Sequence, residues 1–361
     1  MQVLGAALVR SSTTHAHGIV CPPADGILSA VEQYGYETTS FQVLEPGMRF
    51  WSDGSGEGLV AFADTGSAWV SAGAPLCPPD RMYTLTTGFV AAARAAGRRV
   101  CFCAVEAPFS ESGPLRALPI GAQPVWDPNR WPDTLKAVRS LREQLRRARA
   151  RGVQVRQLRP EELRPGTCTR KALEQLAESW LASKRGPALT FLLDVQLFSY
   201  AEERRSFVAE RDGVPVGLLS AIPIHGRRGW FFEDIVRATD APNGTAETLI
   251  DAAMKGCASE GCGHVTMGLV PLSGELPLWL RAVRRLGGHF YDFDGLLRFR
   301  EKLRPHAWEP VRICYPESQS ALSAAWDVLA SVTGGSPLRH GLAVLRSRLY
   351  RTRTGLLARQ M

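Results

Sequence analysis

Residues 206–271 contain the feature that most constrains the fold, an extended hairpin followed by a strand–helix–strand unit. Two apolar runs flank Asp212 and Gly213, a pair that readily adopts positive φ angles and therefore favours a tight hairpin turn. A third extended run, at 230–236, is rich in aromatic and β-branched residues. Apolar residues spaced four apart between 245 and 260 mark one face of a helix, and 264–270 follows as an apolar strand. This order predicts an antiparallel hairpin that leads into a β–α–β crossover.

Length, charge and cysteine usage limit the class of protein. A chain of 361 residues is long enough for one or two domains with cores that need no covalent or metal cross-link. Its 43 Lys and Arg against 35 Asp and Glu give a net charge of +8, which favours an anionic partner such as nucleic acid or a lipid surface. The eight cysteines form no C-x-x-C pair and lie apart from the histidines, so we expect no metal site and a reducing, cytoplasmic location. No apolar run approaches the roughly 18 residues of a membrane-spanning helix, and the N-terminus does not resemble a secretory signal.

The remaining sequence predicts two α/β halves in tandem, with no repeat between them at the level of residues. Helices are expected at 27–34, 83–97, 131–152 and 170–184, and strands at 41–44, 48–51, 58–63, 67–71, 100–105, 122–127 and 153–158. We expect an N-terminal domain at 26–132, a linking helix at 133–152, a catalytic domain at 153–316 and terminal helices at 317–361.

The expected helix at 131–152 is strongly basic. Its residues Arg139, Arg142, Arg146 and Arg149 share a face, and Glu143 is the one acid that opposes them. Like charges four residues apart repel each other unless a polyanion neutralises them. We therefore predict that these four arginines bind tRNA or another polyphosphate, the alternative being a solvated helix face.

The order of elements resembles the core of the GNAT acyltransferase fold. Members that use coenzyme A carry a glycine-rich loop whose backbone N–H groups hold the pyrophosphate at a helix N-terminus. The corresponding loop here, RATDAPNGT at 237–245, has Gly244 alone and places Asp240 and Pro242 where the pyrophosphate would bind. A carboxylate and a missing N–H both oppose such binding, so we expect a donor other than coenzyme A and no cofactor.

Several blocks of sequence resemble one family closely. ERDGVPVGLLSAIP, the D-I-V-R-x-x-x-D-A-P-N-G-T loop, G-L-V-P-L and GLLRFREKLRPHAWEPVRICYP resemble, in order, the C-terminal domain of bacterial lysyl- and alanyl-phosphatidylglycerol synthases. The resemblance extends from about residue 34 to 335. It implies two GNAT-like domains in tandem that transfer an amino acid from aminoacyl-tRNA to a lipid hydroxyl. Leu303 stands where the family often has Phe, and Pro305 lies one residue further from Trp308 than in the family pattern. These two departures affect the inference about the acceptor more than the inference about the fold.

The resemblance also implies roles for individual residues. Glu233 and Asp234 would act as general base or hold the α-amino group, and Arg237 would face a phosphate. The chemistry would be shared by Glu233, Asp234, Arg237 and Lys302, and the substrates would contact Asn243, Gly244, Gly268, Arg304, Trp308 and Glu309. The alternatives are a structural ion pair between Asp234 and Arg237, and a core position for Trp308.

Three functions are compatible with this sequence. The first is transfer of an amino acid from tRNA to an anionic lipid such as phosphatidylglycerol. The second keeps the same donor and uses a soluble amine, hydroxylamine or alcohol in a natural-product pathway, and the third is a non-catalytic binding module. Residues 337–361 carry leucines at helical spacing among arginines and no acid, which predicts either contact with an anionic membrane or a helix docked on the domain. The amino acid that is carried, the oligomeric state and the identity of the general base are left open.

Overall fold

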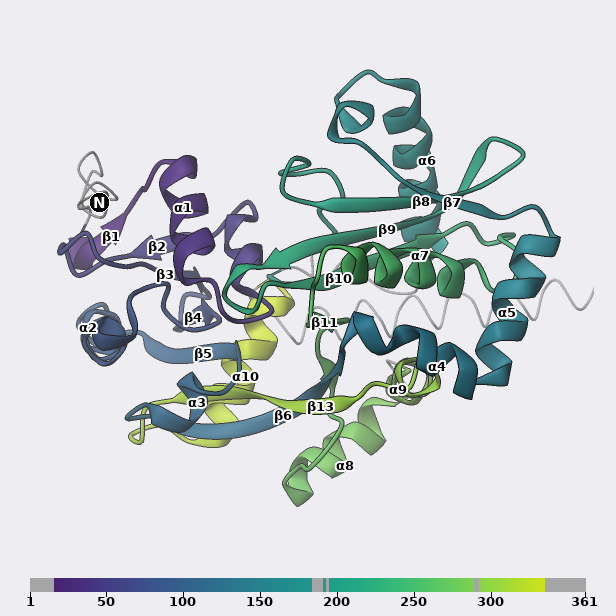
Figure 1. Ribbon diagram of the computed structural model, residues 1–361. Helices are drawn as coiled ribbons and strands as arrows, with labels where there is room; N and C mark the ends of the chain where they lie inside the picture. Colours follow the sequence, from purple (N-terminus) through teal and green to yellow (C-terminus); the bar gives the residue numbers. More distant parts are fainter. Residues whose placement is uncertain (1–15, 184–190, 193–194, 289–291, 335–361) are drawn as a thin grey trace, which may run out of the picture. The chain divides into compact units, whose positions relative to one another are not determined.

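The computed structural model describes residues 16–183, 191–192, 195–288 and 292–334, which form two compact units (Figure 1). The first unit takes in the described residues up to Pro119, residues 191–192, and those from Val311 onward. The second takes in the described residues from Ile120 to 183 and from Val195 to Pro310. Strands β6 (Arg116–Trp126) and β13 (Ala307–Tyr315) each pass from one unit to the other. The basic segment that we expected to link two domains lies within the second unit.

The first unit is built on an antiparallel sheet that contains one parallel pair. Its strand order is β1-β2-β3-β4-β5-β13, and β4 and β5 run parallel because helix α2 connects them. The elements are β1 (Ile19–Val20), α1 (Ala24–Tyr34), β2 (Arg49–Trp51), β3 (Val60–Asp64), β4 (Ala68–Ala72), α2 (Met82–Ala95), β5 (Arg99–Val105), α3 (Phe109–Ser112) and α10 (Ala321–Val332). Its core is aromatic, with Phe89 within 6 Å, centroid to centroid, of Trp51, Phe62, Trp69 and Phe102.

The second unit repeats this plan. Its strand order is β7-β8-β9-β10-β11-β6, and β10 and β11 form the parallel pair that helix α7 connects. The elements are α4 (Trp131–Ala137), α5 (Arg139–Ala150), β7 (Gln154–Gln157), α6 (Cys168–Ser183), β8 (Arg205–Arg211), β9 (Val214–Ile224), β10 (Gly229–Arg237), α7 (Thr245–Ser259), β11 (Val265–Thr266), β12 (Val270–Pro271), α8 (Leu278–Gly287) and α9 (Phe293–Lys302). The predicted hairpin and crossover are confirmed, and Asp212 and Gly213 turn the hairpin with φ angles of 53° and 78°.

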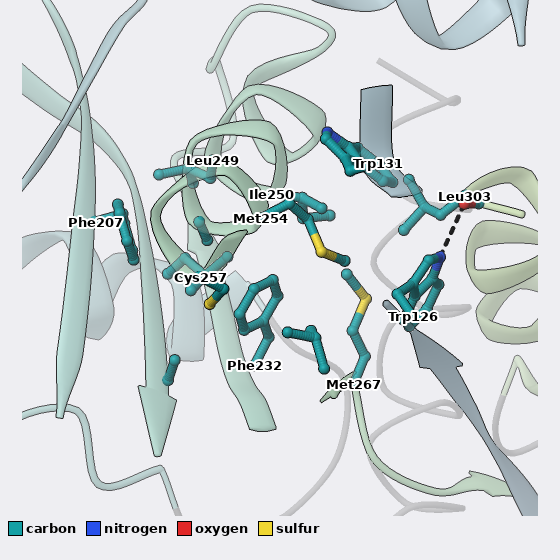
Figure 2. Close-up of a cluster of buried hydrophobic side chains, with 14 of the residues drawn as sticks. Trp126, Trp131, Phe207, Phe232, Leu249, Ile250, Met254, Cys257, Met267 and Leu303 are labelled. Carbon is teal, nitrogen blue, oxygen red and sulfur yellow. Dashed lines mark hydrogen bonds between the residues drawn. The ribbon is translucent and has the colours of Figure 1, made fainter. Parts of the chain in front are cut away.

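Helices α6 and α7 cover opposite faces of this sheet. Residues Leu249, Ile250, Met254 and Cys257 of α7 pack against Phe207 and Phe232, as Figure 2 shows. The opposite face carries Leu218 and Val236, which pack with Leu173 and Leu176 of α6. In the core on the α7 side of the sheet, the indole of Trp126 donates a hydrogen bond to the carbonyl oxygen of Leu303 at 2.9 Å (Figure 2). The periodicity in the sequence therefore reports which strand residues belong to which face.

Two elements differ from the sequence-based expectation. Residues Ser40–Leu44 form a 3-10 helix rather than a strand, and all five are buried, so no alternation between two faces exists for a strand to use. The basic segment is two helices instead of one, because Val138 adopts extended angles (φ −103°, ψ 92°) between α4 and α5. The guanidinium of Arg142 donates to the carbonyls of Leu135 and Lys136, which provides partners for the last turn of α4 at this break.

The strand expected at 264–270 is also divided. β11 pairs with β10 at two positions, Trp230 with Val265 and Phe231 with Thr266, and β12 then pairs with β6. Gly268 lies between the two short strands with a φ of 71°, and a β-carbon at this position would lie 2.7 Å from the ring of Phe231. The chain therefore leaves β10 soon after the parallel pairing starts, and the two strands diverge. Within the described residues, no helix is long and apolar enough to cross a bilayer.

Candidate active site

Strand β10 carries two adjacent carboxylates on the same face of the sheet. Its register with β9 shifts between Phe232 and Asp234, so Glu233 is an extra residue in a β-bulge. Phe232 and Ile235 both belong to the core beside α7, although they are three residues apart. The bulge thus resets the alternation of the strand and directs Glu233 and Asp234 to the opposite face, on the side of α6. Strand β10 pairs with β11 through Trp230 and Phe231, so the two strands separate just before this bulge.

A buried arginine holds the first of these carboxylates. Arg204 pairs with Glu233 at 2.5 Å, and the two side chains are 2% and 5% exposed. The same guanidinium donates to the hydroxyl of Ser220 at 3.2 Å and to the carbonyl of Ser199 at 2.8 Å. An ion pair withdrawn from water this far needs these additional hydrogen bonds to offset its lost hydration. Arg204 therefore holds the Glu233 side chain in one place.

Helix α5 packs against the start of α7. Gly244 precedes α7 with a φ of 96°, and a β-carbon there would collide with the carbonyl oxygen of Gln144 on α5. The N–H of Thr245, the first of α7, is already bonded to the carbonyl of Pro242 at 3.1 Å. In a coenzyme A enzyme this helix terminus must be open, because its N–H groups hold the pyrophosphate. Here a protein backbone lies against it.

A cavity of about 540 Å³ lies beside the same end of α7. It is lined by residues of the α4–α5 break and of the segment after α9, namely Val138, Ser140, Arg298, Glu301, Lys302, Arg304, Pro305 and Trp308. The ammonium of Lys302 pairs at 2.6 Å with Glu247, a buried residue in the first turn of α7. Three cations, one acid and an indole in a common hollow form a site suited to a phosphate and an aromatic base.

A third group of charges surrounds Glu309. Arg227 donates to the Glu309 carboxylate at 2.7 Å, and the amide of Gln123 donates to it at 3.3 Å. Burial opposes ionisation of Glu309, but the bond and charge of Arg227 nevertheless lower its pKa. Burial first, and Arg227 second, lower the pKa of His264 from 6.5 to about 4. Neutral His264 can then accept at Nε2 from Arg227, whose nitrogen lies 3.4 Å away.

Most of the arginines predicted to bind tRNA have partners within the second unit. Arg149 pairs at 2.9 Å with Asp251 of α7, a buried carboxylate that also accepts from Lys255 and from the indole of Trp131. Arg142 binds the end of α4, as described above, and Arg146 pairs with Glu143 at 3.0 Å. Arg139 is exposed at the first position of α5. Arg142, Arg146 and Arg149 therefore make contacts within the second unit, in addition to any contact with nucleic acid.

The predicted site residues fall into separate groups. Lys302, Arg304 and Trp308 share the cavity, whereas Glu309 belongs to the Arg227 cluster and Glu233 and Asp234 lie on the α6 face. Arg237 ends β10 and Asn243 belongs to the loop before α7, and both are exposed. Gly268 lies against the ring of Phe231. The predicted membrane contact at 337–361 lies outside the described residues.

The sequence analysis missed several residues of these clusters, among them Arg204, Arg227, Glu247 and Asp251. Each has a charge that looks like a surface feature when the sequence is read alone. Asp251 and Glu247 did carry a usable signal, since they lie on the helical face of α7 that also holds Ile250 and Met254. Arg204 and Arg227 lie at strand ends, where charge is common, and nothing in the sequence marks them as buried.

The sequence matches the model of a known family. The family model for the C-terminal domain of phosphatidylglycerol lysyltransferase matches residues 29–315, and the chain belongs to this family of transferases. The fold is the tandem GNAT-like one that the sequence predicted. Comparison with curated protein sequences gave no match.

Two solved structures of this kind are similar over nearly their whole length. One is a C-terminal domain from Agrobacterium fabrum described as that of a lysylphosphatidylglycerol synthetase, with a TM-score of 0.71, 20% identity, and coverage of 87% of this chain and 99% of that one. The other is L-PGS from Bacillus licheniformis, with a TM-score of 0.72, 21% identity, and coverage of 85% and 96%. FemX is more distant, with a TM-score of 0.52 at 9% identity over 85% of this chain and 98% of its own. At these identities the likeness establishes the fold.

Proposed function

We propose that this protein transfers an amino acid from aminoacyl-tRNA to the hydroxyl of a membrane lipid, with phosphatidylglycerol as the first candidate. Membership of the phosphatidylglycerol lysyltransferase family supports a lipid acceptor. The donor is inferred from the site itself.

The packing of α5 on the start of α7 is the observation that carries the proposal. A coenzyme A thioester needs free N–H groups at this helix terminus, and the contact between Gly244 and Gln144 leaves no room for a pyrophosphate there. An acyl group activated as a tRNA ester brings its own polyanion and does not need that cradle. The cavity lined by Lys302, Arg304 and Trp308 offers cations for a phosphate and an indole for a base. We assign a phosphate and a base of the tRNA, close to its acceptor end, to this cavity.

The chemistry needs few groups because the aminoacyl ester is already activated. The lipid hydroxyl oxygen attacks the ester carbonyl carbon, the bond to the tRNA ribose oxygen breaks, and the hydroxyl proton ends on that ribose oxygen. A carboxylate that takes the proton and returns it suffices as general base. Glu233 is committed to Arg204, so we assign this role to Asp234, its neighbour beyond the bulge. The Arg204–Glu233 pair then holds the bulge in place beside Asp234.

The decisive experiment uses the full-length protein, a panel of radiolabelled aminoacyl-tRNAs and vesicles that contain phosphatidylglycerol. We expect label in the organic phase for one or a few amino acids, and none when acetyl-coenzyme A replaces the tRNA. Label that appears in the aqueous phase, on an added amine or alcohol, would favour a soluble acceptor. Saturable acetyl-coenzyme A binding with acetyl transfer and no response to tRNA would refute the donor.

The basic face of α5 can be tested with the arginines that are free to change. Arg142 and Arg149 are poor choices, since their loss would disturb the end of α4 and the Asp251 cluster. Arg139→Gln and Arg146→Gln remove exposed charges instead. Each phosphate contact that is lost should reduce the slope of log affinity against log salt by roughly one unit. An unchanged slope in the double variant would place the tRNA elsewhere on the surface.

A further inference from the structure

Helix α8 (Leu278–Gly287) leaves an apolar face without any partner in the described part of the chain. Leu278 is 80% exposed and Leu286 is 72% exposed, whereas Leu280 is buried and anchors the helix to the second unit. Leu278, Ala282 and Leu286 recur four residues apart, so they lie along one line of the helix, with Val283 beside them at 45% exposed. A single exposed leucine needs no explanation, but a row of them on one helix does.

The same helix carries three arginines and no acid. Arg281 and Arg285 are exposed and border the apolar row, since each lies within one turn of it. Arg284 is turned toward the protein, where it donates to the carbonyl of Leu272 at 2.9 Å and pairs with Asp294 at 2.5 Å. Arg285 makes no hydrogen bond or ion pair with the described residues, and Arg281 makes one, to the carbonyl of Leu276. Two guanidinium groups are therefore available along the edge of the apolar face.

We propose that α8 docks this protein on an anionic lipid bilayer, with its leucines inserted among the acyl chains and its arginines at the phosphates. A short helix with Leu and Trp on one face and Arg beside them is the pattern of helices that lie in the membrane interface. Half-buried Trp279 adds an aromatic ring at the boundary, where such rings are favoured. The inference does not depend on the transfer reaction, because binding to vesicles can be measured without tRNA.

A second copy of the chain fits this face less well. In a symmetric dimer the arginines that border the row would approach their own counterparts, and like charges would repel. Ten residues of helix span about 15 Å, which offers far less than the roughly 800 Å² per partner of a stable protein interface. An anionic bilayer has neither limitation, since it supplies negative charge and accepts a small inserted face.

The test is co-sedimentation of the full-length protein with vesicles of mixed phosphatidylglycerol and phosphatidylcholine, compared with vesicles of phosphatidylcholine alone. Leu278→Ser with Leu286→Ser should weaken partition into the anionic vesicles by about tenfold or more. Arg281→Gln with Arg285→Gln should weaken it by about tenfold and should reduce its sensitivity to salt. All four side chains are exposed, so thermal unfolding of the variants should match the parent.

A matched control exists on helix α10. Leu322 and Leu329 are 65% and 44% exposed, and that helix carries no arginine. Leu322→Ser with Leu329→Ser should therefore leave vesicle binding unchanged. The proposal would be overturned if the α8 variants bound vesicles like the parent, or if they changed only the oligomeric state. A parent protein that binds anionic vesicles through α8 but modifies a soluble acceptor would keep this inference and refute the lipid acceptor.

Discussion

The two units use the same fold, and Glu37 and Glu106 of the first are held differently from three carboxylates of the second. In the first unit, Glu37 accepts from the backbone N–H groups of Ala74 and Glu106, at 2.6 and 3.0 Å. Glu106 in turn accepts from the N–H of Thr38 at 2.8 Å. In the second unit, the carboxylates of Glu233, Glu247 and Glu309 face the side-chain cations Arg204, Lys302 and Arg227.

This difference separates a scaffold from a reactive site. A backbone N–H carries no net charge and cannot leave, so Glu37 and Glu106 fix loops in place. A side-chain cation can exchange one anion for another, and the pair of Lys302 and Glu247 lies at a cavity suited to phosphate. Glu37 and Glu106 therefore fix backbone geometry in the first unit, where another buried carboxylate, Asp327, pairs with Arg99 at 2.5 Å. The second unit also holds charge beside a cavity, where a substrate can meet it.

The largest effect should come from Asp234, if the second unit holds the chemistry. Asp234→Asn removes the proposed general base and should slow transfer about 10²–10⁴-fold. Thermal unfolding should change little, because the amide keeps the size of the carboxylate. Initial rates with saturating aminoacyl-tRNA and phosphatidylglycerol vesicles measure the effect.

Asp240→Asn, an exposed acid in the loop before α7, is the matched control and should retain the parental rate. Full activity of Asp234→Asn together with an inactive Glu233→Gln would show that the base was assigned to the wrong carboxylate.

The next largest effect concerns the stability of the second unit. Arg204→Met leaves Glu233 buried without its cation and should lower the free energy of unfolding by about 3–5 kcal/mol. Replacing both partners, as Arg204→Met with Glu233→Leu, should recover much of this loss because no charge is then left unpaired. Urea denaturation of the parent and the two variants measures the loss and its recovery.

A surface pair gives the comparison. Arg49 and Asp64 are 53% and 17% exposed, so Arg49→Met should cost about 1 kcal/mol or less. An equal cost at Arg204 would mean that the buried pair contributes no more than a solvated one.

Much of the fold was predictable because periodicity follows directly from burial. The hairpin turn at Asp212 and Gly213, the helix α7 and the parallel pairing of the strand after it are each confirmed. Apolar residues alternate in a strand and recur every four residues in a helix, and these patterns record which face is covered. Two breaks within predicted elements were not foreseen. The breaks at Val138 and Gly268 depend on a bond from Arg142 and on contact with Phe231, which come from residues elsewhere in the chain.

The grouping of the candidate site residues could not be predicted from the sequence. Lys302, Arg304 and Trp308 share a cavity, but Glu309 does not join them. Residues 308 and 309 are neighbours on β13, and successive side chains of a strand point to opposite faces. The bulge at Glu233 was invisible in the sequence, because an extra residue in a strand changes the face of its neighbours without changing their type.

A smaller effect is expected from the corresponding change in the first unit. Glu37→Gln keeps one oxygen as an acceptor and leaves the N–H of Ala74 or Glu106 without a partner, which should cost about 1–3 kcal/mol of stability. The transfer rate per folded molecule should stay at the parental value, as expected of a scaffold residue. A large fall in rate without a loss of stability would contradict the division between the two units.

The smallest effect is a dependence of stability on pH that arises in the second unit. His264 is neutral in the folded protein down to a pKa of about 4, whereas its ordinary pKa is 6.5. Between these values the unfolded chain binds a proton that the folded protein does not. Stability should therefore fall as pH drops from 6.5 toward 4, with a limiting slope of about 1.4 kcal/mol per pH unit from this residue. Glu309, whose pKa is lowered below 4.5, adds a further loss at still lower pH.

Urea midpoints measured from pH 7 to pH 4.5 test this slope, and His264→Asn should flatten it. His306 also has a pKa lowered by burial, with a smaller contribution from Arg130, so His306→Asn serves as the comparison. Its effect should be weaker because that side chain is exposed to solvent. If His264→Asn and the parent lose stability in parallel, the proton is taken up elsewhere. The cluster of Arg227, Glu309 and His264 would then contribute no pH dependence to the second unit.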